Sequence, residues 1–159
     1  MDLTIKLIVA DFDGVLTDGG IYYGENGQRL KKLNIYDTMA FSILQEHGIQ
    51  SAIIAADSSD ILTYVTEDLG GIKHYENVKD KQAMAEQICN EFGVTMQEMA
   101  FIGDDLNDRA LIENVGLAAC PGNAPGEVQG INNILILHRY GGLGAVRELV
   151  DYIVENEFY

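Results

Sequence analysis

The sequence predicts an α/β protein built as a three-layer, doubly wound parallel sheet with helices on both faces. Two near-continuous apolar runs of strand length, at 5–11 and 50–56, are rich in isoleucine, valine and alanine. Such runs are typical of strands that are covered on both faces. Similar runs alternate with helical patterns along the chain, and this alternation favours a parallel sheet. We expect residues 1–159 to form one domain, because no linker or internal repeat interrupts them.

The remaining elements are shorter. Further strands are expected at 99–105, 115–120 and 132–137. One helix should begin with Lys79-Asp80, since apolar residues follow at helical spacing at Met84, Ile88 and Phe92. The last helix is expected to carry an apolar stripe formed by Leu143, Val146, Leu149, Val150, Ile153 and Val154.

One segment breaks the alternation and predicts a β-hairpin flap at about 19–35. It contains three apolar residues at 21–23, then "GENG", in which Asn26-Gly27 is expected to supply positive-φ turn positions. Because the hairpin directly follows the first strand, it should project above the carboxyl end of that strand. A helix should then run from about Tyr36 to His47, with the His47 ring near its terminal carbonyls, and stop at Gly48. The chain has no room for a separate cap domain.

The composition limits the partners. With 25 acidic and 10 basic residues the formal net charge is −15, so no basic surface exists to attract nucleic acid or anionic lipid. An acidic protein can still bind an anionic substrate through a divalent cation. Cys89 and Cys120 show neither metal-site nor disulfide spacing, and no segment is long and apolar enough for a signal peptide or a membrane span. We therefore expect a cytoplasmic protein.

Two acidic clusters follow predicted strands and should meet. In "DFDGVLTDG", Asp11 and Asp13 end the first strand, and Gly14 lets the backbone approach a ligand closely. In "GDDLND", the aspartates at 104, 105 and 108 follow another strand. Ligands of open parallel sheets bind beyond the carboxyl ends of the strands. Converging carboxylates select a hard cation, and Mg²⁺ is the usual one where phosphates are handled.

These residues predict phosphoryl-transfer chemistry. Asp11 is suited to attack phosphorus and form an aspartyl-phosphate, and Asp13 to protonate the leaving alkoxide and later activate water. Lys81 opens a helix whose terminal amides and charge can hold phosphoryl oxygens. The loop lacks the further oxygen ligands of an EF-hand. A two-component receiver domain would carry an aspartate after the middle strand, where Ala55-Ala56 stand instead.

The order of these motifs resembles the haloacid dehalogenase superfamily, and "DGVLTDG" together with the closing "GGLGAVRE" resembles its capless branch. The resemblance covers nearly the whole chain. It implies a phosphatase of a sugar-acid phosphate, such as 3-deoxy-D-manno-octulosonate 8-phosphate or a nonulosonate 9-phosphate. It also implies a homotetramer in which the hairpins assemble and neighbouring subunits cover each other's active sites.

The resemblance also assigns roles residue by residue. Asp11 corresponds to the nucleophile and a Mg²⁺ ligand, and Asp13 to the acid/base, whose backbone carbonyl also ligates the metal. The other implied roles are as follows: Lys81 binds phosphate, Asp104 is the third protein ligand to Mg²⁺, Asp105 and Asp108 support the metal site, Asn107 orients Lys81, and Arg147 lies near the substrate.

The chain departs from the family in the phosphate cradle. Where the family has Ser or Thr followed by Gly, this chain has Ala55-Ala56, which leaves backbone amides but no hydroxyl. Loss of one hydrogen bond to a charged group costs about 1.5–3 kcal/mol. Ser58 or Ser59 can replace the hydroxyl if the loop bends inward; otherwise Ser58 caps the next helix.

A second departure concerns the substrate. The family has Arg or Glu where Asp57 stands, so an anionic sugar acid would meet an acidic group there. Arg29, Lys31 and Lys32 on the hairpin can compensate. Two alternatives stay open beside the phosphatase: an impaired or inactive phosphatase-like module that serves assembly or ligand binding, and a phosphomutase or phosphoprotein phosphatase.

Overall fold

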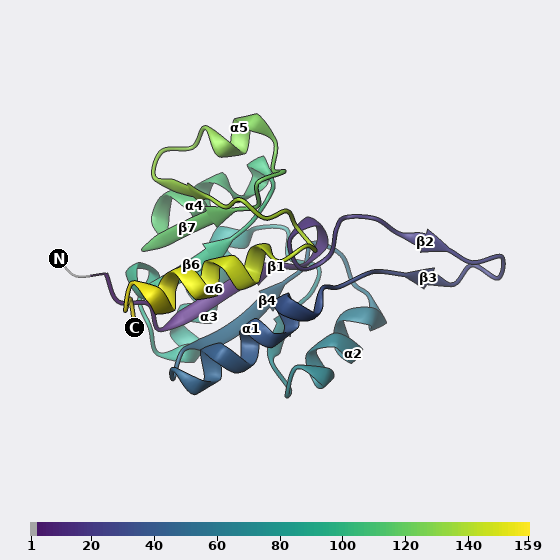
Figure 1. The fold of residues 1–159 in the computed structure, drawn as a ribbon, viewed down its shortest axis with the longest axis horizontal. Helices are drawn as coiled ribbons and strands as arrows, with labels where there is room; N and C mark the ends of the chain where they lie inside the picture. The colour runs from purple at the N-terminus through teal and green to yellow at the C-terminus, as the bar shows by residue number, and fades with distance from the viewer. Residues whose placement is uncertain (1–2) are drawn as a thin grey trace.

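A computed structural model describes residues 3–159 and contains a six-stranded, entirely parallel sheet (Figure 1). The strand order is β5-β4-β1-β6-β7-β8, so the chain winds outward in both directions from the central strand β1. The predicted doubly wound parallel sheet is confirmed. The strands are β1 (Leu7–Asp11), β4 (Gln50–Ile54), β5 (Lys73–Tyr75), β6 (Met99–Ile102), β7 (Leu117–Cys120) and β8 (Ile134–Ile136).

Helices cover both faces of the sheet. One face packs against α1 (Ile35–Glu46), α2 (Asp60–Asp68) and α6 (Ala145–Glu155), and the other against α3 (Lys81–Phe92), α4 (Arg109–Asn114) and α5 (Gly126–Gln129). Alternate residues of β1 enter the two cores: Ile8 and Ala10 lie in one, Leu7 and Val9 in the other, and all four are buried. This burial on both faces explains why the strand has no polar alternation.

The helix ends follow local sequence signals. Asn34 caps the start of α1, and the helix ends before Gly48, whose φ of +70° suits glycine. His47 Nδ1 lies 2.8 Å from the carbonyl oxygen of Ile43, as expected for a histidine at a helix end. The expected apolar stripe of the last helix is correct except at Leu143, which precedes α6 and is 46% exposed.

The edge strand β5 was not expected. Its sequence, Lys-His-Tyr, has no apolar run, because the strand pairs on one side only and is half exposed. The runs at 50–56 and 99–105 also end as strands earlier than expected, at Ile54 and Ile102. The residues that follow form the turns beside the candidate site.

The hairpin stands away from the body of the protein (Figure 1). Its strands, β2 (Tyr22–Tyr23) and β3 (Arg29–Leu30), are antiparallel and exposed, and a bridge between Thr17 and Leu33 closes its base. Only Gly27 of the expected Asn26-Gly27 pair has a positive φ, because the turn closes from Gly24 to Gly27 and needs one left-handed residue. Among residues 3–159, no helix has the length and apolar character needed to cross a membrane.

Candidate active site

The candidate site lies beyond the carboxyl ends of β1 and β6, the two central strands. Asp11 is the last residue of β1, and Asp104 comes two residues after the end of β6. Ala10 pairs in register with Ile102, so the two acidic turns leave the sheet side by side. The sheet topology therefore brings together the two clusters that the sequence places more than ninety residues apart.

The turn after β1 requires glycine for a close approach. Gly14 has a φ of +79°, and a Cβ atom there would overlap the Oδ2 atom of Asp104. On the other side, a Cβ at Gly141 would overlap the carbonyl oxygen of Gly14, and the N–H of Gly142 donates to the carbonyl of Val15 over 2.9 Å. The glycine-rich loop before α6 thus supports the turn that carries Asp11 and Asp13.

Lys81 joins both acidic clusters. It is the first residue of α3, after the N-cap Asp80, and its ammonium lies 2.9 Å from Asp11 Oδ2 and 2.6 Å from Asp108 Oδ1. The lysine side chain is 9% exposed, and Asp108 is fully buried. Burial alone would lower the pKa of Lys81, but the carboxylates of Asp11 and Asp108 outweigh it and raise the pKa. The lysine is therefore a fixed positive charge beside Asp11.

Three carboxylates cluster beside this ammonium, and two of them, Asp11 and Asp108, contact it. Oxygen atoms of Asp11, Asp104 and Asp108 all lie within 4.8 Å of one another. Burial, together with repulsion from Asp108 and Asp104, raises the pKa of Asp11 to about 7 although Lys81 opposes the shift. Burial and the neighbouring Asp108 likewise raise the pKa of Asp104 to about 6. Because carboxylates so close repel when ionised, the cluster fits a divalent cation with oxygen ligands.

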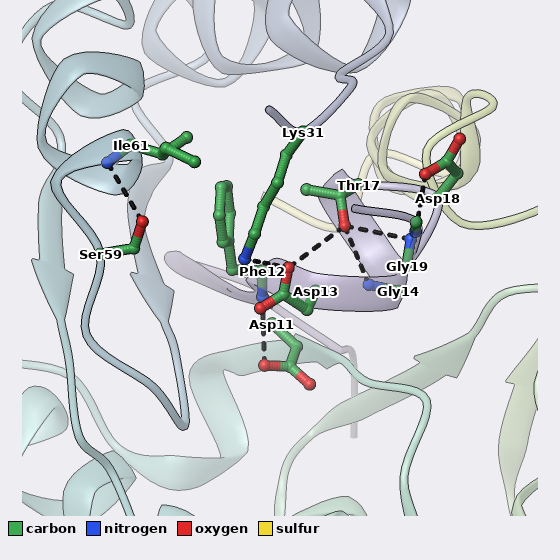
Figure 2. Close-up of polar contacts among 11 residues, drawn as sticks. Asp11, Phe12, Asp13, Gly14, Thr17, Asp18, Gly19, Lys31, Ser59 and Ile61 are labelled. Atoms are coloured by element: carbon green, nitrogen blue, oxygen red, sulfur yellow. Dashed lines mark hydrogen bonds and ion pairs between the residues drawn. The ribbon is translucent and has the colours of Figure 1, made fainter. Parts of the chain in front are cut away.

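Asp13 lies outside this cluster and faces the hairpin. Figure 2 shows the side chain of Lys31 reaching from the hairpin onto the Asp13 carboxylate, with 2.7 Å between Lys31 Nζ and Asp13 Oδ1. Thr17 Oγ1 donates to the same oxygen over 3.4 Å. The Asp13 side chain is 46% exposed, so it remains accessible to a bound molecule.

Thr17 and Lys31 are contacts of Asp13 that the sequence did not assign. Thr17 is fully buried, and its hydroxyl accepts the N–H groups of Gly14 and Gly19, each over 3.2 Å. Its position inside "DFDGVLT" was the available signal. For Lys31 the signal was the alternation along the return strand of the hairpin, which turns Lys31 inward and Lys32 outward to Asp18.

The turn that carries the second acidic cluster, residues 104–108, is stabilised by hydrogen bonds among its own residues. Asp105 accepts the N–H of Asn107 over 3.4 Å, and its own N–H donates to Asp108 Oδ2 over 3.3 Å, a capping arrangement. Asp105 and Asn107 are exposed. Within residues 3–159, the carboxylates in ion-pair contact with Lys81 are those of Asp11 and Asp108, and the described hydrogen bond of Asn107 goes to Asp105 rather than to Lys81.

The end of β4 differs from the sequence expectation. The N–H of Ala55 donates to the carbonyl of Tyr75 over 2.8 Å, so this amide is already used within the sheet. Ala56 is exposed, and its carbonyl accepts the Lys79 ammonium over 3.2 Å. The expectation that Ser58 caps α2 is wrong: Ser59 accepts the N–H of Ile61 over 3.2 Å (Figure 2), because it directly precedes the helix. Ser58 instead donates to Glu76 over 3.0 Å.

A cavity of about 420 Å³ opens between the hairpin and the start of α2, next to Asp13. It is lined by Asp13, Ile21, Arg29, Lys31, Asp57, Ser58, Ser59 and Ile61. The lining therefore contains two cationic side chains, those of Arg29 and Lys31, and one carboxylate in addition to Asp13, that of Asp57. Arg147 is not part of this lining: its Nε atom pairs with Asp151 over 2.8 Å, one turn further along α6.

Comparison with known proteins identifies the class. A model of the haloacid dehalogenase-like hydrolases matches residues 22–140. The chain belongs to this family, as the order of the aspartate and lysine motifs indicated. The structure also shares the capless architecture of its neighbours, and the enzyme is a phosphatase of this family.

The chain is similar to particular members of this family. The chain is 32% identical over 154 residues to the 3-deoxy-D-manno-octulosonate 8-phosphate phosphatase of Haemophilus influenzae. The matched region covers 96% of this chain and 84% of the relative. A hydrolase of subfamily III A from Legionella pneumophila superposes with a TM-score of 0.92 at 36% identity, covering 96% of this chain and 84% of the other. The octulosonate phosphatase of Moraxella catarrhalis, solved with magnesium, phosphate and the sugar acid, gives 0.90 at 29% identity, covering 97% and 89%.

Proposed function

We propose that the protein is a Mg²⁺-dependent phosphomonoesterase that works through an aspartyl-phosphate intermediate. The observation that carries the proposal is the position of Asp11. Its carboxylate ends the central strand, 2.9 Å from the ammonium of Lys81, and shares a cluster within 4.8 Å with Asp104 and Asp108. A nucleophile, a phosphate-binding cation and a set of metal ligands therefore lie at one point of the sheet.

The metal ligands in this proposal are the carboxylates of Asp11 and Asp104, with the backbone carbonyl of Asp13 as a further ligand. Asp108 supports the site by holding the Lys81 ammonium over 2.6 Å. Asp105 supports it by capping the turn that carries Asp108. When bound, Mg²⁺ would neutralise phosphoryl oxygens and hold the ester in line with the nucleophile. The relative from Moraxella catarrhalis, solved with a magnesium ion, supports this choice of metal.

The chain's own residues supply two displacement steps. An oxygen of Asp11 bonds to phosphorus while the bond from phosphorus to the leaving alcohol breaks, and Asp13 gives that alcohol its proton. Asp13 then takes a proton from water, which attacks phosphorus and releases inorganic phosphate from Asp11. Lys81 holds phosphoryl oxygens throughout, and we propose Gly14, Ala56 and Asn107 as further phosphate contacts. Ala55 lies beside these contacts and offers no amide to the phosphate, because its N–H already donates to the carbonyl of Tyr75.

The proposed substrate is a sugar-acid phosphate, such as 3-deoxy-D-manno-octulosonate 8-phosphate or a nonulosonate 9-phosphate. The names of the relatives support it, and so does a cavity of about 420 Å³ with cationic and hydrogen-bonding groups next to Asp13. Asp57 would contact hydroxyl groups of the sugar. Arg147 would contact the substrate only after leaving Asp151, its present partner.

We also propose a cytoplasmic homotetramer in which residues 1–159 act as one hydrolase domain with the hairpin flap at about 19–35. Assembly through this element is supported by its exposed apolar residues, whose exposed fractions range from 46% to 71%: Ile21, Tyr22, Tyr23 and Leu30. Both cysteines are free and buried, which suits a reducing compartment.

The test is hydrolysis of a panel of sugar phosphates by the purified protein with and without Mg²⁺. We expect phosphate release that needs Mg²⁺ and is abolished by EDTA. Asp11→Asn should lower the rate by a factor of a thousand or more while the protein stays folded, since it removes the nucleophile and one charge from a repelling cluster. Mg²⁺-independent release, or an Asp11→Asn variant with near-normal turnover, would contradict the proposal.

A further inference from the structure

Lys31 has a largely buried side chain on a hairpin whose residues 21–30 are all exposed. Its side chain is 10% exposed, whereas Leu30 is 53% exposed and the side chain of Lys32 is 51% exposed. The bridge between Thr17 and Leu33 fixes this part of the hairpin against the turn after β1. The Lys31 ammonium also lies 5.3 Å from the centre of the Phe12 ring, within the range of cation–π attraction. A long and usually mobile cation is thus held in one place.

The Lys31 ammonium is held against one oxygen of the Asp13 carboxylate. Lys31 Nζ lies 2.7 Å from Asp13 Oδ1, and the Thr17 hydroxyl donates to the same Oδ1 atom over 3.4 Å (Figure 2). The two donors come from different segments, one from the hairpin and one from the turn after β1. Their convergence on Oδ1 fixes the rotation of the carboxyl group and leaves Oδ2 as the oxygen that can carry a proton.

We propose that Lys31 is a positioning residue for the acid/base Asp13. The inference rests on the proposed phosphatase function. By holding Oδ1, Lys31 turns Oδ2 toward the leaving group, so that Oδ2 passes its proton to the ester oxygen as the bond from phosphorus to that oxygen breaks. Since Lys31 belongs to the hairpin, the position of the hairpin is coupled to proton transfer at the active site.

This role has a signature that a purely structural role lacks. A leaving alkoxide, as from a sugar phosphate, needs a proton, whereas the anion released from p-nitrophenyl phosphate is stable without one. The quantity kcat/KM reports only the steps up to release of the alcohol. We therefore expect Lys31→Met to lower kcat/KM about ten- to a hundredfold for a sugar phosphate and less than threefold for p-nitrophenyl phosphate.

Three variants make the comparison specific. Lys73→Met removes an exposed cation of the edge strand β5 that pairs with Glu91 over 3.5 Å, and it should leave both kcat/KM values unchanged. Lys31→Arg keeps a cation and should restore most of the sugar-phosphate activity. Lys31→Gln replaces Lys31→Met if circular dichroism shows that the latter is unfolded.

The outcomes separate this inference from the function on which it rests. An equal loss with both substrates, or no loss with either, would overturn the positioning role. A rise in KM confined to carboxylate-bearing substrates would assign Lys31 to substrate binding and overturn it as well. If the unmodified protein hydrolyses neither ester with Mg²⁺, the proposed function itself fails, and the role of Lys31 with it.

Discussion

Ala55 occupies the position at the end of β4 where the family resemblance places a hydroxyl. It is buried, its N–H bonds to Tyr75, and its carbonyl accepts the N–H of Val78 over 3.1 Å. The backbone there is therefore held in place by the edge strand and the loop that follows it. What the proposed phosphate cradle lacks at this position is a hydroxyl donor, because the hydroxyls of Ser58 and Ser59 bond to Glu76 and to the first turn of α2.

We predict that Ala55→Ser raises kcat/KM for the preferred phosphate ester by about ten- to a hundredfold. One hydrogen bond to a charged group is worth about 1.5–3 kcal/mol, and each 1.4 kcal/mol is tenfold in rate. Steady-state kinetics at saturating Mg²⁺ would measure the change. The double variant Asp11→Asn, Ala55→Ser should stay inactive, which controls for a contaminating phosphatase. An unchanged kcat/KM in the single variant would mean that Ala55 does not face the phosphate.

At the scale of single residues, the sequence was informative where a motif and the topology agreed. Asp11, Lys81 and Asp108 were expected to meet because each follows a strand or opens a helix at the same edge of a parallel sheet. Contacts set by one-residue differences in a loop were beyond such reasoning. Ser58 and Ser59 are equally suited to cap a helix, and only the start of α2 at Asp60 decides between them.

At the scale of elements, the sheet and both helical layers were predictable, whereas β5 was not. A central strand such as β1 is buried on both faces and shows an apolar run, but β5 owes its place to backbone pairing with β4. The hairpin was predictable from its turn. Alternation along the return strand indicated that Lys31 turns inward, but the group that it contacts depended on how the base of the hairpin is fixed to Thr17.

The hairpin also leads to a prediction about assembly. Tyr22 and Tyr23 are 59% and 71% exposed, so they bury little surface within the chain. The double variant Tyr22→Ser, Tyr23→Ser should therefore keep its far-ultraviolet circular dichroism but change from the proposed tetramer to a smaller species. Light scattering after size exclusion would measure the mass.

A matched control comes from α2. Tyr64 is 68% exposed and lies outside the hairpin, so Tyr64→Ser should leave the mass unchanged. If the unmodified protein is a monomer at micromolar concentration, assembly through the hairpin is excluded, and its apolar side chains need another explanation.

At the scale of the whole molecule, repulsion within the net charge of −15 and repulsion within the buried carboxylate cluster both affect the free energy of unfolding. Burial raises the pKa of Asp11 to about 7 and that of Asp104 to about 6, both above the value of 3.8 for an unperturbed aspartate. Between about pH 4 and 7 the folded state thus holds more protons at this cluster than the unfolded state. Without metal, the contribution of the cluster to the free energy of unfolding should therefore fall as the pH rises through this window.

Mg²⁺ should reverse this trend, because it binds the ionised carboxylates that are costly without it. We predict that saturating Mg²⁺, at about a hundred times its Kd at pH 8, raises the Tm by about 5–10 °C at that pH. At pH 5, where protons compete for Asp11 and Asp104, the same Mg²⁺ concentration should raise the Tm by less than half as much. Differential scanning fluorimetry at both pH values would measure the shift. Asp104→Asn should reduce the shift at pH 8, whereas Asp18→Asn, which alters a partly exposed carboxylate outside the cluster, should preserve it. Equal shifts at the two pH values would show that the ion binds elsewhere, since a site made of these carboxylates must lose affinity as they take up protons.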